Sequence, residues 1–182
     1  STRLEGHSAF EAFLPIYAAL HELERERNTH PHSLFDGTAL PYPISVGTIR
    51  AGDWASSVPD LLIAEGRMGV QLGEPPAEAR AALERALARV SESDAWLRDH
   101  PVELSWPGGQ FASGRIAGDD PLIAETAAVI ADVEGRSAAT AAAPYGSDLR
   151  LYSGIGGIPT LHYGPGDVRY AHAPREQVDI EE

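Results

Sequence analysis

The residues best suited to chemistry in this chain lie between positions 145 and 178. Ser147, Asp148 and Arg150 follow a Tyr-Gly pair and predict the start of a short helix that ends at Gly154. The exposed N–H groups of a helix start, beside an arginine guanidinium, form a good cradle for a carboxylate. These three side chains are therefore our first candidates for substrate binding. The alternative interpretation is an ordinary N-cap beside a surface arginine.

Two glycines and a histidine follow in the same stretch. Gly164 and Gly166 flank a proline, so the backbone there either approaches a ligand closely or makes a tight turn. His172 lies in a loop beside Pro174, and a neutral imidazole suits zinc. The alternative is a loop histidine that caps a helix or contacts solvent.

Composition restricts the class of protein. With 182 residues, of which 43% are hydrophobic, the chain can form one domain or two small ones with a real core. Its net charge of −13 argues against nucleic-acid binding, which needs clustered Lys and Arg. The absence of Cys excludes disulfides, thiolate zinc sites and a Cys nucleophile. No apolar run approaches the roughly 18 residues of a membrane span, so we expect a cytoplasmic protein with no membrane contact.

The first part of the chain alternates between helical and strand-like patterns. Period-3.6 and period-2 spacing of apolar residues predict a helix at 9–27, strands at 44–51, 61–72 and 102–106, and a helix that begins at Pro75-Pro76. Pro15 implies that the first helix either starts near Glu11 or is kinked. The residues between 28 and 43 are predicted to form a long loop.

A glycine-rich crossing at 107–118 is the predicted domain boundary. Beyond it we expect a helix from Asp119-Asp120-Pro121 to about Gly135, a strand or connection at 138–143, and a buried strand at 158–163. The predicted fold class is therefore α/β (α+β). Residues 1–115 would form a ferredoxin-like βαββαβ unit that lacks its first strand, and residues 116–182 would form a second α/β layer. Both ends of the chain read as interrupted, so we expect the missing strand before Ser1.

Several motifs in this order are similar to those of a known enzyme family. They are Val46 to Gly52 with Ser56 to Asp60, Glu65-Gly66-Arg67, Tyr145 to Arg150, Gly164-Pro165-Gly166, and His172 with Glu176. The chain resembles the metal-dependent amidohydrolases and peptidases that include aminoacylase, acetylornithine deacetylase, succinyl-diaminopimelate desuccinylase and carboxypeptidase G. The resemblance covers nearly the whole chain.

The resemblance implies an architecture and a set of site residues. Residues 1–115 would be most of a lid that dimerises, and residues 116–182 the C-terminal part of a zinc-exopeptidase-like catalytic domain. His172 would be one ligand of a two-metal site holding Zn²⁺ or Co²⁺. The other ligands and the general base are expected upstream of Ser1. Ser56 stands where the family has Asn, and it would either contact the substrate or be a plain turn residue.

These observations lead to two hypotheses of different classes. The first is a partial chain of a metal-dependent hydrolase that cleaves the amide bond of N-acyl amino acids or small peptides, similar to acetylornithine deacetylase. Arg150 would then clamp the substrate carboxylate, with Ser147, Asp148, Gly164 and Gly166 around it. The second hypothesis is a catalytically inactive module for dimerisation or ligand binding. Either way, we expect a homodimer through the lid.

Overall fold

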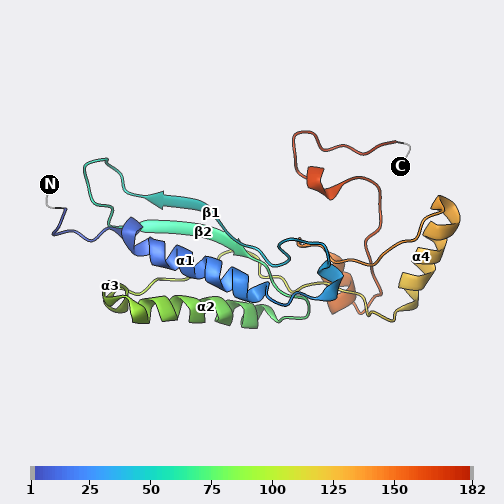
Figure 1. Ribbon diagram of the computed structural model, residues 1–182, viewed down its shortest axis with the longest axis horizontal. Helices are drawn as coiled ribbons and strands as arrows, with labels where there is room; N and C mark the ends of the chain where they lie inside the picture. Colours follow the sequence, from blue (N-terminus) through green and yellow to red (C-terminus); the bar gives the residue numbers. More distant parts are fainter. Residues whose placement is uncertain (1–2, 181–182) are drawn as a thin grey trace.

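The computed structural model describes residues 3–180 as an elongated mixture of helices and a small sheet (Figure 1). The elements follow in the order α1 (Ala9–Arg27), η1 (Ser33–Phe35), β1 (Ile44–Ala51), β2 (Leu62–Met68), α2 (Pro76–Ser93), α3 (Ala95–Asp99), α4 (Pro121–Glu134), η2 (Arg150–Ile155) and η3 (Val168–Tyr170). The predicted helices at 9–27, from Pro75-Pro76 and from Pro121 are confirmed, as is the strand at 44–51. The strand predicted at 61–72 is confirmed only in part, because β2 ends at Met68 and the chain turns at residues 72–73. No helix within residues 3–180 is long and apolar enough to cross a bilayer.

Helix α1 is held by polar caps at both ends. The Ser8 hydroxyl accepts a hydrogen bond from the Glu11 N–H at 3.3 Å, so the helix begins at Ala9 and Pro15 lies inside it. Asn28 caps the other end and exchanges two hydrogen bonds of 2.9 Å with the Tyr42 backbone. The long loop predicted between α1 and β1 is thereby tied back to the helix from which it leaves.

Strands β1 and β2 pair antiparallel, in a register that places Ile44 opposite Met68 and Ala51 opposite Leu62. A bulge interrupts the pairing between Val46 and Thr48. A Cβ atom on Gly66 would lie closer than 3.0 Å to the Ser45 carbonyl oxygen. The glycine is therefore required for the two strands to approach each other at this point.

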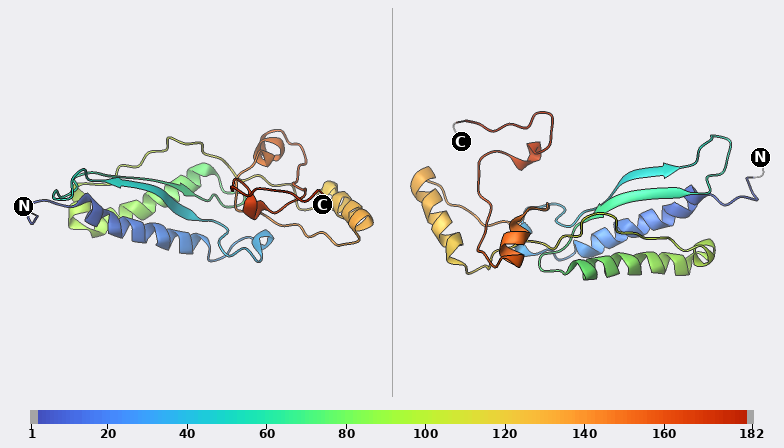
Figure 2. Two further views of the ribbon diagram at one scale, coloured as in Figure 1. Left: turned by 90° about the horizontal axis from the view of Figure 1, so that it is seen from above. Right: turned by 180° about the vertical axis from the view of Figure 1, so that it is seen from behind.

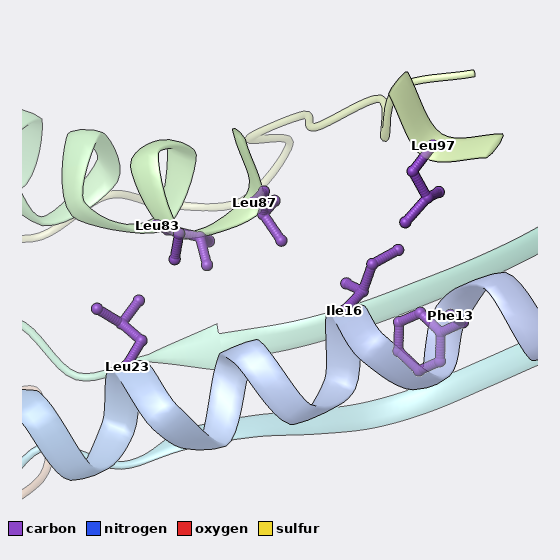
Figure 3. Close-up of a cluster of buried hydrophobic side chains, with 7 residues drawn as sticks. Phe13, Ile16, Leu23, Leu83, Leu87 and Leu97 are labelled. Carbon is purple, nitrogen blue, oxygen red and sulfur yellow. The ribbon is translucent and has the colours of Figure 1, made fainter. Parts of the chain in front are cut away.

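The core lies between α1, α2 and α3 (Figure 3). Its buried side chains are Phe13, Ile16, Leu23, Leu83, Ala86, Leu87 and Leu97. The inner face of the sheet adds partly buried apolar side chains, which are those of Ile44, Val46, Leu62 and Met68. The amphipathic periodicity of α1 and α2 therefore predicts the right interface, since each helix buries one stripe against the other.

An ion pair with little solvent access joins the end of α1 to the loop before α2. Arg27 donates to the two carboxylate oxygens of Glu74 at 2.9 and 2.6 Å and to the Gly69 carbonyl at 2.8 Å. The Arg27 side chain is 7% exposed and that of Glu74 is 13% exposed. Gln71 completes the cluster, because its N–H donates to Glu74 and its side-chain amide donates to the Arg27 carbonyl.

The predicted third strand at 102–106 is wrong. The sheet of the described residues 3–180 has two strands, and residues 102–106 run as irregular chain. The alternation of apolar residues still determines which side chains are buried, because Val102 and Trp106 pack against the core while Leu104 is 38% exposed. A period-2 pattern selects which side chains face the core, but it supplies no strand edge with which to pair. Of the predicted βαββαβ arrangement, the structure shows a small antiparallel sheet with α1 packed on it and α2 packed on α1 (Figure 1).

After residue 107 the chain still contacts α2, because Arg80 donates to the Gln110 side chain, and it then runs on to α4 (Figure 1 and Figure 2). Gly135 ends α4 with a left-handed φ of 66°, as the predicted helix end requires. The buried strand predicted at 158–163 is wrong, since this segment is irregular and Ile158 and Tyr163 are more than half exposed. Tyr163 instead donates its hydroxyl to Glu134, and this hydrogen bond raises the pKa of the phenol and lowers the pKa of the carboxyl.

Candidate functional site

The turn around η2 carries three of the predicted binding residues. The expected short helix is present as a π-helical turn at Arg150–Ile155. Ser147 precedes it, and its Oγ accepts a hydrogen bond from the Leu149 N–H at 3.3 Å. The capping role predicted for Ser147 is wrong, because Leu149 occupies the N-cap position of η2 and no side chain caps this helix.

Ser147 also has a partner that the sequence did not indicate. Its Oγ lies 2.8 Å from Nε2 of His162. Because the Leu149 N–H donates to Oγ, the hydroxyl proton can point toward an unprotonated Nε2. His162 comes from the segment that we expected to be a buried strand, and no local sequence pattern marks it as a neighbour of Ser147.

Arg150 is held by an aromatic ring from the glycine-rich crossing. Its guanidinium Cζ lies 4.1 Å from the centroid of the Phe111 ring, within the range of a cation–π contact. Asp148 Oδ1 lies 3.8 Å from the same guanidinium, and its side chain is 74% exposed. The positive charge of Arg150 is thus already shared between a ring and a solvated carboxylate.

The backbone at Gly114 explains how the crossing reaches this turn. A Cβ atom on Gly114 would lie closer than 3.0 Å to both the N and the Cα of Arg150. Only glycine permits this approach, so the stretch that we predicted as a boundary packs directly on η2. The many glycines of this stretch indicate in the sequence that its backbone approaches another segment closely, but they do not identify which residue it contacts.

His172 lies apart from this turn. Figure 1 shows η3, which precedes His172, well separated from η2. The His172 backbone adopts a φ of 60°, which is uncommon for a non-glycine residue, and its N–H donates to the Glu176 carboxylate at 3.1 Å. Within residues 3–180 no group of three or more His, Asp or Glu side chains is placed to hold a metal ion.

The remaining predicted residues are two glycines of the segment after η2 and a serine of the β1–β2 loop. Gly166 has a φ of 92°, which a tight turn accounts for, whereas Gly164 needs no special conformation. Beside them, hydrogen bonds from Arg169 lower the pKa of Asp167 to about 2. Ser56 is exposed on the β1–β2 loop, which Figure 1 places at the opposite end of the helix pair from η2. Ser147, Asp148 and Arg150 thus share one turn, which His162, two residues before Gly164, contacts through Ser147, whereas the loop that carries Ser56 lies at the other end of the helix pair.

Comparison with known proteins supports one part of the sequence interpretation. No protein-family model matches the chain. It is similar to the N-formyl-4-amino-5-aminomethyl-2-methylpyrimidine deformylase of Halalkalibacterium halodurans, with 25% identity over 190 residues. It is also similar to the deformylase of the same name from Bacillus subtilis strain 168, with 28% identity over 193 residues. Each match covers 97% of this chain but 43% of the relative, so the chain spans less than half the length of either protein.

The names of these relatives describe hydrolases that act on an amide. This supports similarity to amide hydrolases in general, and it gives no support to an inactive module. The acyl group in the names of both relatives is formyl and the amine is an aminopyrimidine, so neither relative is named as an acetylornithine deacetylase. Membership of the family named above and dependence on a metal stay predictions.

Proposed function

We propose that these residues serve in an enzyme that hydrolyses the amide bond of a small N-acylated amine, a formamide above all. The observation that carries the proposal is the match of 97% of the chain to two proteins that share one deformylase activity. The polar turn at Ser147, Asp148 and Arg150 supports it, since exposed groups there can bind the polar atoms of a small substrate. The products would be formate and a free amine.

The predicted roles away from η2 belong to the same proposal. Ser56, Gly164 and Gly166 would contact the substrate through a hydroxyl and through backbone groups. His172 would be one imidazole ligand of Zn²⁺ or Co²⁺, which as a Lewis acid would polarise the amide. Further metal ligands would come from outside residues 3–180, because no group of three His, Asp or Glu side chains among these residues is placed to hold a metal ion. The general base would come from upstream of Ser1, as the family resemblance implies.

The lid unit at 1–115 is also proposed to form a homodimer. Within residues 3–180, β1 and β2 pair only with each other, so each leaves one strand edge unpaired. Phe10, Leu14 and Tyr17 of α1 are each at least 42% exposed, which adds apolar surface beside the sheet. Light scattering coupled to size exclusion would test this, and a monomer at micromolar concentration would refute it.

The activity is tested on the protein as its source cells make it. Purified protein is incubated with N-formyl-4-amino-5-aminomethyl-2-methylpyrimidine, and formate is measured with a formate dehydrogenase assay. We expect formate release, with little or no acetate released from N-acetylornithine under the same conditions. Absence of formate release, with or without added Zn²⁺ or Co²⁺, would refute the proposed function.

A further inference from the structure

The contact between Arg150 and Phe111 has a shape suited to a flat ligand. A guanidinium group and a phenyl ring are both planar, and here the Cζ atom lies 4.1 Å from the ring centroid. Phe111 remains 51% exposed and the Arg150 side chain 22% exposed, so the pair is not sealed inside a core. Aromatic and guanidinium faces together attract conjugated rings through stacking and cation–π contacts.

Two glycines hold this pair in place. A Cβ atom on Gly109 would collide with the Phe111 ring, and a Cβ atom on Gly114 would collide with the Arg150 backbone. The crossing therefore folds back on itself around Phe111 and is pressed against η2. The pair owes its position to two chain segments in contact, and not to the chance placement of two long side chains.

The surrounding charges favour a neutral ring that carries an amino group over a carboxylate. Asp148 lies 3.8 Å from the Arg150 guanidinium and is 74% exposed. An incoming carboxylate would be repelled by Asp148 and would have to compete with it for Arg150. An amino group on a ring would instead find an acceptor in Asp148, while the ring itself stacks on the pair.

We infer that Arg150 and Phe111 form a stacking platform for an amino-substituted, conjugated heterocycle, with Asp148 as acceptor for its amino group. This rests on the proposed function, because the heterocycle would be the amine half of the formamide substrate. It replaces the carboxylate clamp predicted for Arg150 with a specificity role toward the ring. The aminopyrimidine in the names of the two relatives is a ligand of this class.

The test compares a formamide that has the ring with one that lacks it. KM is measured for N-formyl-4-amino-5-aminomethyl-2-methylpyrimidine and for N-formylbutylamine. Arg150→Lys keeps the positive charge but removes the planar guanidinium group. Phe111→Leu keeps an apolar side chain but removes the aromatic ring. We expect each variant to raise KM for the pyrimidine by about tenfold, the size of one cation–π or stacking contact. KM for N-formylbutylamine should change by less than about twofold.

Matched controls are available on the first helix pair. Arg89→Lys on α2 alters an arginine that is 60% exposed, and Phe10→Leu on α1 alters a phenylalanine that is 49% exposed. Both should leave the two KM values unchanged. Equal effects of Arg150→Lys and Phe111→Leu on both substrates would overturn the platform, as would a larger effect of Arg150→Lys on N-formylglycine than on the pyrimidine.

Binding separates this inference from the proposed function. Saturation-transfer NMR with 4-amino-5-aminomethyl-2-methylpyrimidine reports contact with the ring even if no hydrolysis occurs. Signals that weaken in Arg150→Lys and Phe111→Leu, but not in the two controls, would support the platform in a protein that lacks deformylase activity. Full signals in all four variants would overturn it whatever the activity.

Discussion

Replacing Glu74 by Gln tests whether the ion pair with Arg27 holds the first part of the molecule together. The change keeps the size of the side chain and one acceptor oxygen, but it removes the negative charge. Arg27, whose side chain is 7% exposed, would then keep its charge with a neutral amide and the Gly69 carbonyl as partners. Arg27 Nε already has no hydrogen-bond partner among the described residues, so a lost bond to Glu74 would leave the guanidinium still less satisfied.

The expected cost follows from this burial. Breaking a buried pair by removing one partner costs about 3–5 kcal/mol. Because the introduced glutamine would retain one hydrogen bond to Arg27, we expect the lower end, about 3 kcal/mol. With a urea slope of about 2 kcal/mol/M, the unfolding midpoint followed by circular dichroism should fall by about 1.5 M.

A surface pair and a double variant control for other causes. Glu22 binds Arg25 on the exposed side of α1, so Glu22→Gln should cost about 0–1 kcal/mol. Replacing both Arg27 and Glu74 by Met leaves no unpaired charge, so the double variant should be more stable than Glu74→Met alone. A loss below about 1 kcal/mol for Glu74→Gln, or a double variant less stable than Glu74→Met, would refute the reasoning.

The pH dependence of stability gives an independent check on the same pair. Burial raises the pKa of Glu74, but the hydrogen bonds from Arg27 and the Gln71 N–H, with the charge of Arg27, outweigh it and lower the pKa. Since the folded pKa is the lower one, the stabilisation is complete above the unfolded value of about 4.3 and is lost as pH falls through the folded value. Wild-type protein should therefore lose more stability than Glu74→Gln between about pH 6 and pH 3.

Three further changes test separate parts of the molecule. Gly114→Ala should displace the crossing from Arg150 and weaken aminopyrimidine binding measured by NMR. Gly118→Ala is the control, because a Cβ atom there has nothing within 4 Å, and it should leave binding unchanged. Equal spectra for both variants would refute the close approach. Ser8→Ala removes the cap of α1 and should cost about 1 kcal/mol in urea unfolding, and no change in midpoint would count against the cap. His172→Ala should abolish most formate release while leaving the circular dichroism spectrum unchanged, and full activity would remove His172 from the proposed metal site.

The helices and the paired strands could be predicted because their determinants are local. Ser8 and Gly135 mark helix ends with a cap and a left-handed turn, and the apolar stripes of α1 and α2 select the interface. The strands predicted at 102–106 and 158–163 failed for a common reason. A strand needs a neighbouring strand to receive its backbone hydrogen bonds, and a period-2 pattern does not predict which segment that neighbour is.

The same distinction between local and long-range determinants applies to the candidate site. The polar turn at Ser147, Asp148 and Arg150 was visible in sequence because it is contiguous. Its partners were not visible, since Phe111 and His162 reach it from the crossing before α4 and from the segment after η2. Both contacts bring in a residue from another segment, one to Arg150 at the start of η2 and one to Ser147 just before it. A binding position built in this way depends on two flanking segments at once. Substitutions in the glycine-rich crossing should therefore alter substrate recognition as strongly as substitutions in the turn itself.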